Sequence, residues 1–181
     1  MRLFIGADIN SRSKELIENR LSNLKSELDN KINWVEKDNW HLTLKFLGES
    51  TVKEKDKLID ILKETDFCGE NKYLQFSRLD AFPDKDAAKI IYLGLSRGKN
   101  ILIDLHQNLE NKLSKNGFQK DVREYKPHLT LGRNKGKPFK LKKELGQRYL
   151  INIYARLESV NLYQSKLKAD GPEYIKLFSI K

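Results

Sequence analysis

The tetrapeptide His-Leu-Thr-Leu occurs twice in this chain of 181 residues, at His41–Leu44 and at His128–Leu131. The two copies are 87 residues apart, close to half of the chain length, and they use two of its three histidines. Each copy follows a segment with the pattern of a helix and a strand, which is typical of an internal duplication. We therefore expect a fold built from two related halves, each of which contributes one copy.

The order of residues within the repeat indicates its chemistry, because alternate residues of a β-strand project from the same face of a sheet. His41 therefore shares a face with Thr43, and His128 shares a face with Thr130, while the leucines point into the core. Two such strands side by side would present two imidazoles and two hydroxyls to one cleft. A neutral imidazole can accept a proton while a charged one donates, and threonine hydroxyls can donate to phosphate oxygens. The repeat thus predicts phosphoryl-transfer chemistry.

A zinc site at His41 and His128 is an alternative interpretation of the repeat. Zinc needs a third and a fourth ligand, and no Asp, Glu or His lies at a recognisable ligand spacing beside either copy. The single cysteine, Cys68, excludes a disulfide framework and a cysteine-rich zinc site. The third histidine, His106, lies beside the apolar stripe of a predicted helix and receives no chemical role. We expect neither a metal nor a cofactor.

Hydrophobic periodicity predicts that helices and strands alternate along the chain. Predicted helices lie at 13–30, 52–64 and 101–116, and predicted strands lie at 2–9, 39–46, 73–82, 89–95, 128–133, 150–164 and 174–180. The Gly-rich strand-to-helix turn of a dinucleotide-binding fold is missing from the sequence. We therefore expect an α+β fold with a largely antiparallel sheet, in which residues 1–181 form a single domain with two pseudo-symmetric lobes.

Charge suggests the kind of partner, because the chain has 35 Lys and Arg against 25 Asp and Glu, a net charge of +10. The window 120–148 alone holds ten basic and three acidic residues. A basic patch favours a polyanion such as RNA, although a solvated basic loop would have the same composition. The apolar run near the start is too short for a signal peptide, and there is no apolar run of 18 residues, so we expect neither a leader nor a membrane span. We expect a cytoplasmic monomer with no membrane partner.

The sequence resembles the 2H phosphoesterases, and within them the RNA 2′,3′-cyclic phosphodiesterases that are also called 2′-5′ RNA ligases. The resemblance runs over nearly the whole chain and implies a bilobal, pseudo-twofold fold with antiparallel sheets lining a cleft and helices outside. It is carried by Arg2-Leu3-Phe4-Ile5-Gly6, Trp40-His41-Leu42-Thr43-Leu44-Lys45-Phe46-Leu47-Gly48, Ala81-Phe82-Pro83, Lys126-Pro127-His128-Leu129-Thr130-Leu131-Gly132-Arg133, Leu162-Tyr163-Gln164-Ser165 and Gly171-Pro172-Glu173-Tyr174.

The resemblance also implies an activity, the opening of an RNA-terminal 2′,3′-cyclic phosphate to a 2′-phosphate. It implies that His41 protonates the leaving 3′-oxygen, that His128 activates water, and that Thr43, Thr130 and Arg133 bind the phosphate. The reverse reaction would join RNA ends through a 2′-5′ linkage. Two alternatives stay open, which are hydrolysis of 2′-5′ oligonucleotides or small cyclic nucleotides, and a non-catalytic RNA-binding module.

Strand alternation conflicts with part of this assignment. The resemblance places Phe46 and Phe82 in a nucleobase pocket, yet Phe46 and Arg133 each follow a motif histidine by five residues and should face away from it. Gly132 permits a bulge before Arg133, whereas no comparable residue precedes Phe46, which could equally be a core aromatic. Lys45 has the parity of the first motif histidine, so we expect it in the cleft or in solvent.

Overall fold

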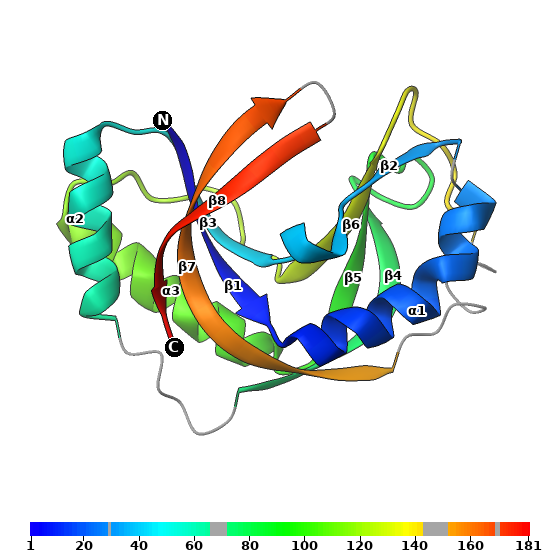
Figure 1. Cartoon of the computed structure of the whole chain (residues 1–181), viewed down its shortest axis with the longest axis horizontal. Coiled ribbons are helices and arrows are strands. Elements are labelled where there is room, and N and C mark those ends of the chain that lie inside the picture. Colours follow the sequence, from blue (N-terminus) through cyan, green and yellow to red (C-terminus); the bar gives the residue numbers. More distant parts are fainter. Residues whose placement is uncertain (29, 66–71, 143–151, 169–170) are drawn as a thin grey trace.

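The computed structural model describes residues 1–28, 30–65, 72–142, 152–168 and 171–181, which form three α-helices, a 3-10 turn and eight strands (Figure 1). In chain order these are β1 (Arg2–Ile9), α1 (Ser11–Leu28), β2 (Ile32–Trp34), the 3-10 turn η1 (Lys37–Asn39), β3 (Leu42–Glu49), α2 (Val52–Lys63), β4 (Tyr73–Phe82), β5 (Ile90–Arg97), α3 (Lys99–Lys115), β6 (His128–Asn134), β7 (Ile153–Lys168) and β8 (Gly171–Ile180).

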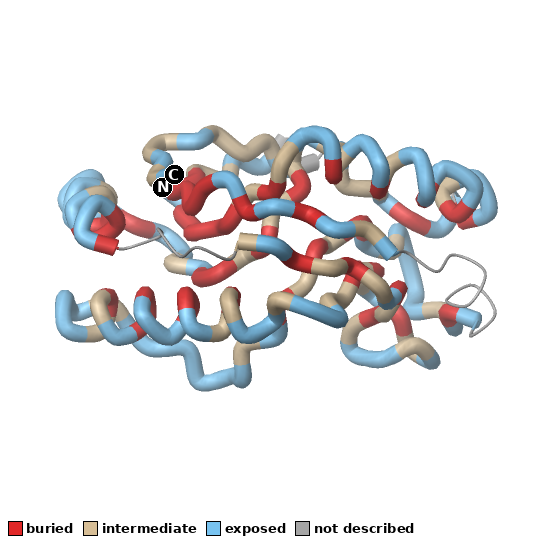
Figure 2. Tube along the Cα trace, turned by 90° about the horizontal axis from the view of Figure 1, so that it is seen from below, coloured by how far each residue is buried: buried red, intermediate tan, exposed pale blue. Residues whose placement is uncertain are grey.

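The strand pairs of the described residues are all antiparallel, and six strands pair in a closed ring in the order β1, β3, β6, β5, β4 and β7. The ring closes because the first residues of β7 pair with β4 while its middle pairs with β1. β8 pairs with the far part of β7, and β2 pairs with β6. The helices lie outside the strands with their exposed sides outward (Figure 2). The predicted α+β fold with antiparallel sheets is confirmed.

Helix ends follow local sequence signals. The apolar stripe of α1 is buried against the strands, at Ile17, Leu21, Leu24 and Leu28. α2 begins with a capping box, because the Thr51 hydroxyl accepts from the backbone N–H of Glu54 while the Glu54 carboxylate accepts from the backbone N–H of Thr51. α3 is followed by Gly117 at a φ of 89°, the left-handed conformation that favours glycine after a helix.

Predicted and observed strands agree best where one face is plainly apolar. The predicted strands at 2–9 and 73–82 coincide with β1 and β4. The strand predicted at 39–46 is shifted in the structure, because η1 occupies residues 37–39 and β3 runs on to Glu49. β2, with only three residues, was too short for a periodic signal. Of the strand predicted at 150–164, residues 150 and 151 lie outside the described residues.

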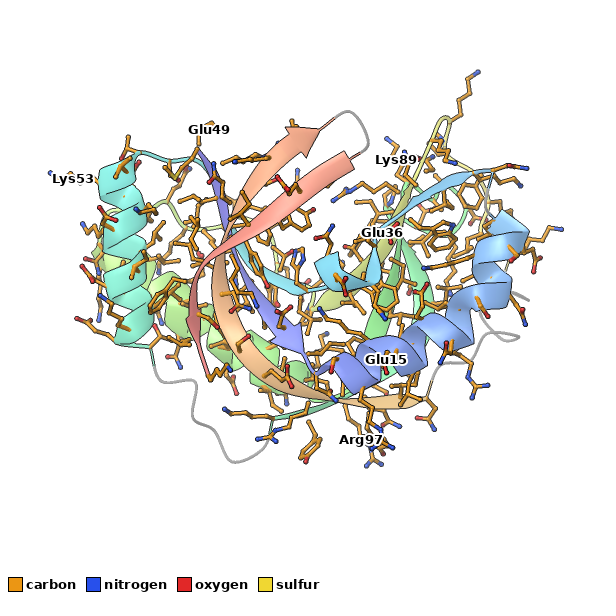
Figure 3. The ribbon with its side chains drawn as sticks, in the orientation of Figure 1. Glu15, Glu36, Glu49, Lys53, Lys89 and Arg97 are labelled. Atoms are coloured by element: carbon orange, nitrogen blue, oxygen red, sulfur yellow. The ribbon has the colours of Figure 1, made fainter. Side chains whose placement is uncertain are left out.

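The hydrophobic core contains the leucines of both motif copies. Leu42, Leu44, Leu129 and Leu131 are each at most 2% exposed and belong to one continuous cluster of buried side chains. Charged side chains such as Lys53 and Arg97 point away from the fold (Figure 3). No helix among the described residues is both long and apolar enough to cross a membrane. The core therefore fixes which face of the motif strands is left for chemistry.

Candidate active site

The two copies of the motif meet directly, because β3 pairs antiparallel with β6 through Leu42 and Leu129. Continuing this register by one residue places His41 across from Thr130 and Thr43 across from His128. The leucine pair faces the core, so all four polar side chains lie on the opposite face. Diagonal neighbours on paired strands are about 7–8 Å apart, which leaves room for a phosphate between the two imidazoles. The structure thus brings together the residues that the repeat predicted.

His41 is held by a backbone carbonyl. Its Nδ1 lies 2.7 Å from the carbonyl oxygen of Asn39, and its Nε2 lies 3.0 Å from the hydroxyl oxygen of Thr43. A carbonyl oxygen can only accept, so Nδ1 carries the hydrogen. In the neutral ring Nε2 therefore has a free lone pair, which accepts from Thr43. η1, which ends at Asn39, provides this carbonyl.

His128 is held in the same way, two residues after its own anchor. Its Nδ1 lies 2.6 Å from the carbonyl oxygen of Lys126. The Nδ1–H tautomer is again selected, and Nε2 is again the nitrogen available to a reactant. The two histidines thus share one spacing from the anchoring carbonyl and one tautomer, in which Nε2 is the nitrogen that can accept a proton.

Burial keeps both imidazoles neutral at pH 7. It lowers the pKa of His41 to about 4, although the Asn39 carbonyl and the charge of Asp8 act in the opposite direction. Burial also lowers the pKa of His128, and the positive charge of Arg133 adds to that lowering. The charge of His128 contributes to the low pKa of His41, so the two rings interact electrostatically. Two neutral, mutually coupled imidazoles therefore face the site.

A bulge in β3 reverses the alternation after the first motif. In the β1–β3 register Ile5 pairs with Lys45 and Gly6 pairs with Thr43, so one residue of β3 is extra. Lys45 consequently turns into the interior, where it is 3% exposed, and Phe46 turns outward, where it is 64% exposed. Both expectations for Lys45, a place in the cleft or in solvent, are wrong. The interpretation of Phe46 as a core aromatic is wrong too.

A second bulge stands at the equivalent place in β6. In the β5–β6 register Ile91 pairs with Gly132 and Tyr92 pairs with Thr130, again with one extra residue. Gly132 is buried and Arg133 is exposed, the same reversal as in β3. A Cβ at Gly132 would lie 2.5 Å from a methyl carbon of Ile32, so β2 packs against the space that this glycine leaves. The bulge that Gly132 was expected to permit is present.

Arg133 joins the two halves of the site electrostatically. Its positive charge lowers the pKa of His128 and opposes the rise that burial causes in the pKa of Tyr174. The Tyr174 ring lies edge-on to the His41 ring, with centroids 5.2 Å apart. One guanidinium thus acts on His128 itself and on a tyrosine beside His41.

Aromatic rings surround His41. The Phe4 ring lies 4.8 Å from the imidazole, and the Tyr163 ring lies 5.7 Å from it. Phe46 reaches this cluster through Phe4, with ring centroids 6.1 Å apart. A polar pocket opens beside these rings and is lined by Asp8, Asp38, Asn39, His41, Tyr163, Tyr174 and Lys176. The first half of the site therefore combines ring faces with hydrogen-bonding groups.

His128 has its own aromatic neighbours. The Phe82 ring stacks on Tyr92 with centroids 4.4 Å apart, and both rings are edge-on to the His128 imidazole at 4.9 and 5.1 Å. Phe46 and Phe82 thus lie in the two different halves of the site, each near one histidine. Among the described residues no ring contact joins Phe46 to Phe82.

The side chains that could hold a metal lie away from both motif histidines. Within the described residues, the one such group is His106, Glu110 and Asp121. The ammonium of Lys45 lies 2.7 Å from Glu110 and 2.8 Å from Asp121, and so provides the cation that these carboxylates need. The donor set of this cluster therefore fits an ion-pair network.

Several residues of the site were not predicted as functional. The carbonyls of Asn39 and Lys126 could have been found from their spacing, because each precedes a motif histidine by two residues. Tyr163 and Tyr174 stand in segments that carried the family resemblance, but received no role. Tyr92 had no signal apart from its place on a strand. The basic window 120–148 is described only as far as residue 142.

Two related antiparallel halves, each presenting a carbonyl-anchored imidazole on one shared face, define a two-histidine phosphoesterase. The family described as LigT like Phosphoesterase matches residues 13–92 and 93–174, and each range holds one copy of the motif. The chain belongs to this LigT-like phosphoesterase family, and the predicted family is confirmed.

Individual relatives cover nearly the whole chain. A protein of Methanocaldococcus jannaschii named RNA 2′,3′-cyclic phosphodiesterase is 34% identical over 177 residues, 96% of each chain. One of the same name from Aquifex aeolicus is 30% identical over 179 residues, 96% of this chain and 93% of the relative. Among solved structures, TT0787 of Thermus thermophilus has a TM-score of 0.83 at 19% identity, covering 99% of this chain and 96% of that one. Escherichia coli LigT complexed with 3′-AMP has a TM-score of 0.71 at 21% identity with the same coverage. These two structures share the fold.

Proposed function

We propose that this protein hydrolyses RNA-terminal 2′,3′-cyclic phosphates to 2′-phosphates by acid–base catalysis with two histidines. The observation that carries this proposal is the pair of imidazoles, anchored alike at Nδ1, that face one site from paired strands. The curated relatives are named RNA 2′,3′-cyclic phosphodiesterase, which is the class of reaction proposed here. A plain phosphate-binding module would need Lys or Arg in place of two neutral imidazoles.

In this mechanism each histidine moves one proton through Nε2. His128 takes a proton from water while the water oxygen forms a bond to phosphorus. The bond between phosphorus and the 3′-oxygen breaks, and protonated His41 gives its Nε2 proton to that oxygen. The product carries a 3′-hydroxyl and a 2′-phosphate. A 5′-hydroxyl in place of water would give a 2′-5′ linkage by the same steps.

His41 has to take up a proton from solvent when the substrate binds, because a pKa of about 4 leaves this ring neutral at pH 7 in the free protein. A cyclic phosphodiester has a negative charge, and a negative charge next to an imidazole favours its charged form. Binding of the phosphate therefore raises the pKa of His41 toward 7, so that more of the ring is protonated at pH 7. His128 is already in the neutral form that a general base needs.

Three further side chains are suited to the phosphate. Thr43 and Thr130 present hydroxyls beside the two imidazoles, and the exposed Arg133 can give two charge-assisted hydrogen bonds to nonbridging oxygens. Phe46 has 64% of its surface exposed, so its ring can stack on a nucleobase. This would be the base of the nucleotide whose 3′-oxygen is protonated by His41. Phe82 offers a ring edge on the His128 side, where water or a second nucleotide would enter.

Product analysis tests this function directly. RNA oligonucleotides ending in a 2′,3′-cyclic phosphate, 2′-5′ oligonucleotides and small cyclic nucleotides are incubated separately with the purified protein. We expect the RNA ends to give 2′-phosphates at a rate that EDTA does not change, because imidazoles make both proton transfers. A 3′-phosphate product would contradict the role of His41, and a rate abolished by EDTA and restored by a divalent metal would contradict the two-histidine mechanism.

A further inference from the structure

The buried ammonium of Lys45 connects the first motif to the segment that leads into the second. It forms ion pairs with Glu110 of α3 at 2.7 Å and with Asp121 at 2.8 Å, and donates to the carbonyl oxygen of Gln119 at 2.8 Å. The other oxygen of Glu110 accepts from the backbone N–H of Asp121 at 2.9 Å. A buried charge is tolerated only when it is paired and hydrogen-bonded. This ammonium therefore ties segment 119–121 firmly to β3 and α3.

His106, one helical turn before Glu110, forms a second connection between the same elements. Its Nδ1 donates to the carbonyl oxygen of Leu44 at 2.9 Å, inside the bulge of β3. Its ring stacks on Tyr125, with centroids 4.2 Å apart and planes 16° apart. α3 thus holds the β3 bulge on one side and both ends of segment 119–125 on the other.

The residue after Tyr125 is Lys126, whose carbonyl selects the tautomer of His128. Tyr125 and Lys126 are joined by one planar peptide unit, so only the two backbone torsions of Lys126 separate the held Tyr125 from this carbonyl. The Asn39 carbonyl that holds His41 belongs to η1 and makes no contact with this network among the described residues. The network therefore leads to the carbonyl anchor of His128 and not to that of His41.

We propose that Lys45 and Glu110 are positioning residues for His128. By anchoring segment 119–126 they keep the Lys126 carbonyl on Nδ1, so that Nε2 stays unprotonated and directed at the reactant. The consequence for turnover rests on the function proposed above, whereas the consequence for the tautomer does not.

Ring-nitrogen NMR of 15N-labelled protein without substrate tests the tautomer, at a pH above the pKa values of both histidines. In the wild type we expect one tautomer at His41 and at His128. In Lys45→Met we expect His128 to exchange between both tautomers while His41 keeps one. On a mononucleoside 2′,3′-cyclic phosphate we expect kcat to fall about 10- to 100-fold with little change in KM, as for a misplaced catalytic group.

Lys57→Met is the matched control, because its ammonium also donates to a carbonyl, that of Asn116, but on the surface at the end of α3. It should keep the wild-type tautomers and kcat. If Lys45→Met does not fold, Glu110→Gln decides, since it removes the charge but leaves an acceptor for the Asp121 N–H. It should show the same changes to a smaller degree.

Two results would overturn the proposal. One is a folded Lys45→Met or Glu110→Gln variant in which His128 keeps a single tautomer and the wild-type kcat. The other is an equal disturbance of His41 and His128, which would indicate general loosening of the fold. If the wild type turns over no cyclic phosphate, the proposed function fails, while the tautomer comparison still decides this inference.

Discussion

Phe46 and Arg133 occupy equivalent places in the two halves of the molecule, each five residues after a motif histidine and one residue beyond a bulge. Both are exposed on the face that carries the imidazoles. The same backbone device therefore delivers a ring to one side of the site and a guanidinium to the other. This pairing of a ring with a guanidinium fits the proposed substrate, in which Phe46 would contact a nucleobase and Arg133 would contact the phosphate.

Replacing either histidine should nearly abolish turnover. Each proton transfer is worth roughly 10²–10⁴-fold, so we expect losses of this size in kcat for His41→Ala and for His128→Ala. Circular dichroism should show an intact fold. The wild-type rate should follow a bell-shaped pH profile, and its two apparent pKa values should describe His41 and His128 as an interacting pair. Wild-type activity in either variant would exclude the two-histidine mechanism.

Stability should fall in mild acid because of His41. Its pKa is about 4 in the folded protein against 6.5 ordinarily, so between these values the unfolded chain binds more protons. This contribution is complete above pH 6.5 and disappears as the pH falls through 4. Acid lowers the free energy of unfolding, and we expect His41→Gln to make this decrease smaller by up to about 3 kcal/mol. Urea unfolding at a series of pH values measures this, and an unchanged pH slope would contradict it.

Arg133→Lys should lose most of the activity although the charge is kept. Each charge-assisted hydrogen bond is worth about 1.5–3 kcal/mol, and lysine lacks the planar fork that makes two of them at once. We expect the loss in kcat, because these bonds strengthen as charge develops in the transition state. Steady-state kinetics on a mononucleoside cyclic phosphate checks this. A change confined to KM would assign Arg133 to ground-state binding.

Gly6→Ala should disturb the site with little change elsewhere. A Cβ at Gly6 would lie 3.0 Å from Cδ2 of His41, so the imidazole has to move. A displaced catalytic group loses rate steeply, and we expect kcat to fall by about tenfold or more at nearly unchanged melting temperature. Gly136→Ala is the control, because a Cβ there meets no atom within 4 Å. Equal kcat in both variants would show that His41 adapts freely.

The basic segment after β6 should contribute to RNA affinity. Reversing Lys135 and Lys137 to Glu should weaken binding of a cyclic-phosphate oligonucleotide and flatten its salt dependence, with the slope falling by about one for each phosphate that is no longer neutralised. Both side chains are exposed. Hydrolysis of a mononucleoside cyclic phosphate should change little. Equal losses on both substrates would assign these lysines to the fold or to the catalytic site.

Much of the site was readable from the sequence, because a repeated strand motif carries its own geometry. The period of two placed His41 with Thr43 and His128 with Thr130, on the face opposite buried leucines. The spacing of the two copies indicated two related halves. Such inferences are local, since they need only the direction of side chains along one strand.

Tertiary structure decided what lies beyond the fourth residue of the first motif, whereas Gly132 in the sequence had already indicated a bulge in the second. The bulges in β3 and β6 depend on the registers with β1 and β5, so periodicity put Lys45 and Phe46 on the wrong faces. The ion pairs of Lys45 join positions up to 76 residues apart, and the burial that lowers the pKa of both histidines comes from segments that are also distant in the sequence. A period of two specifies faces only within an unbroken strand, and the pairing of distant strands determines where that strand breaks.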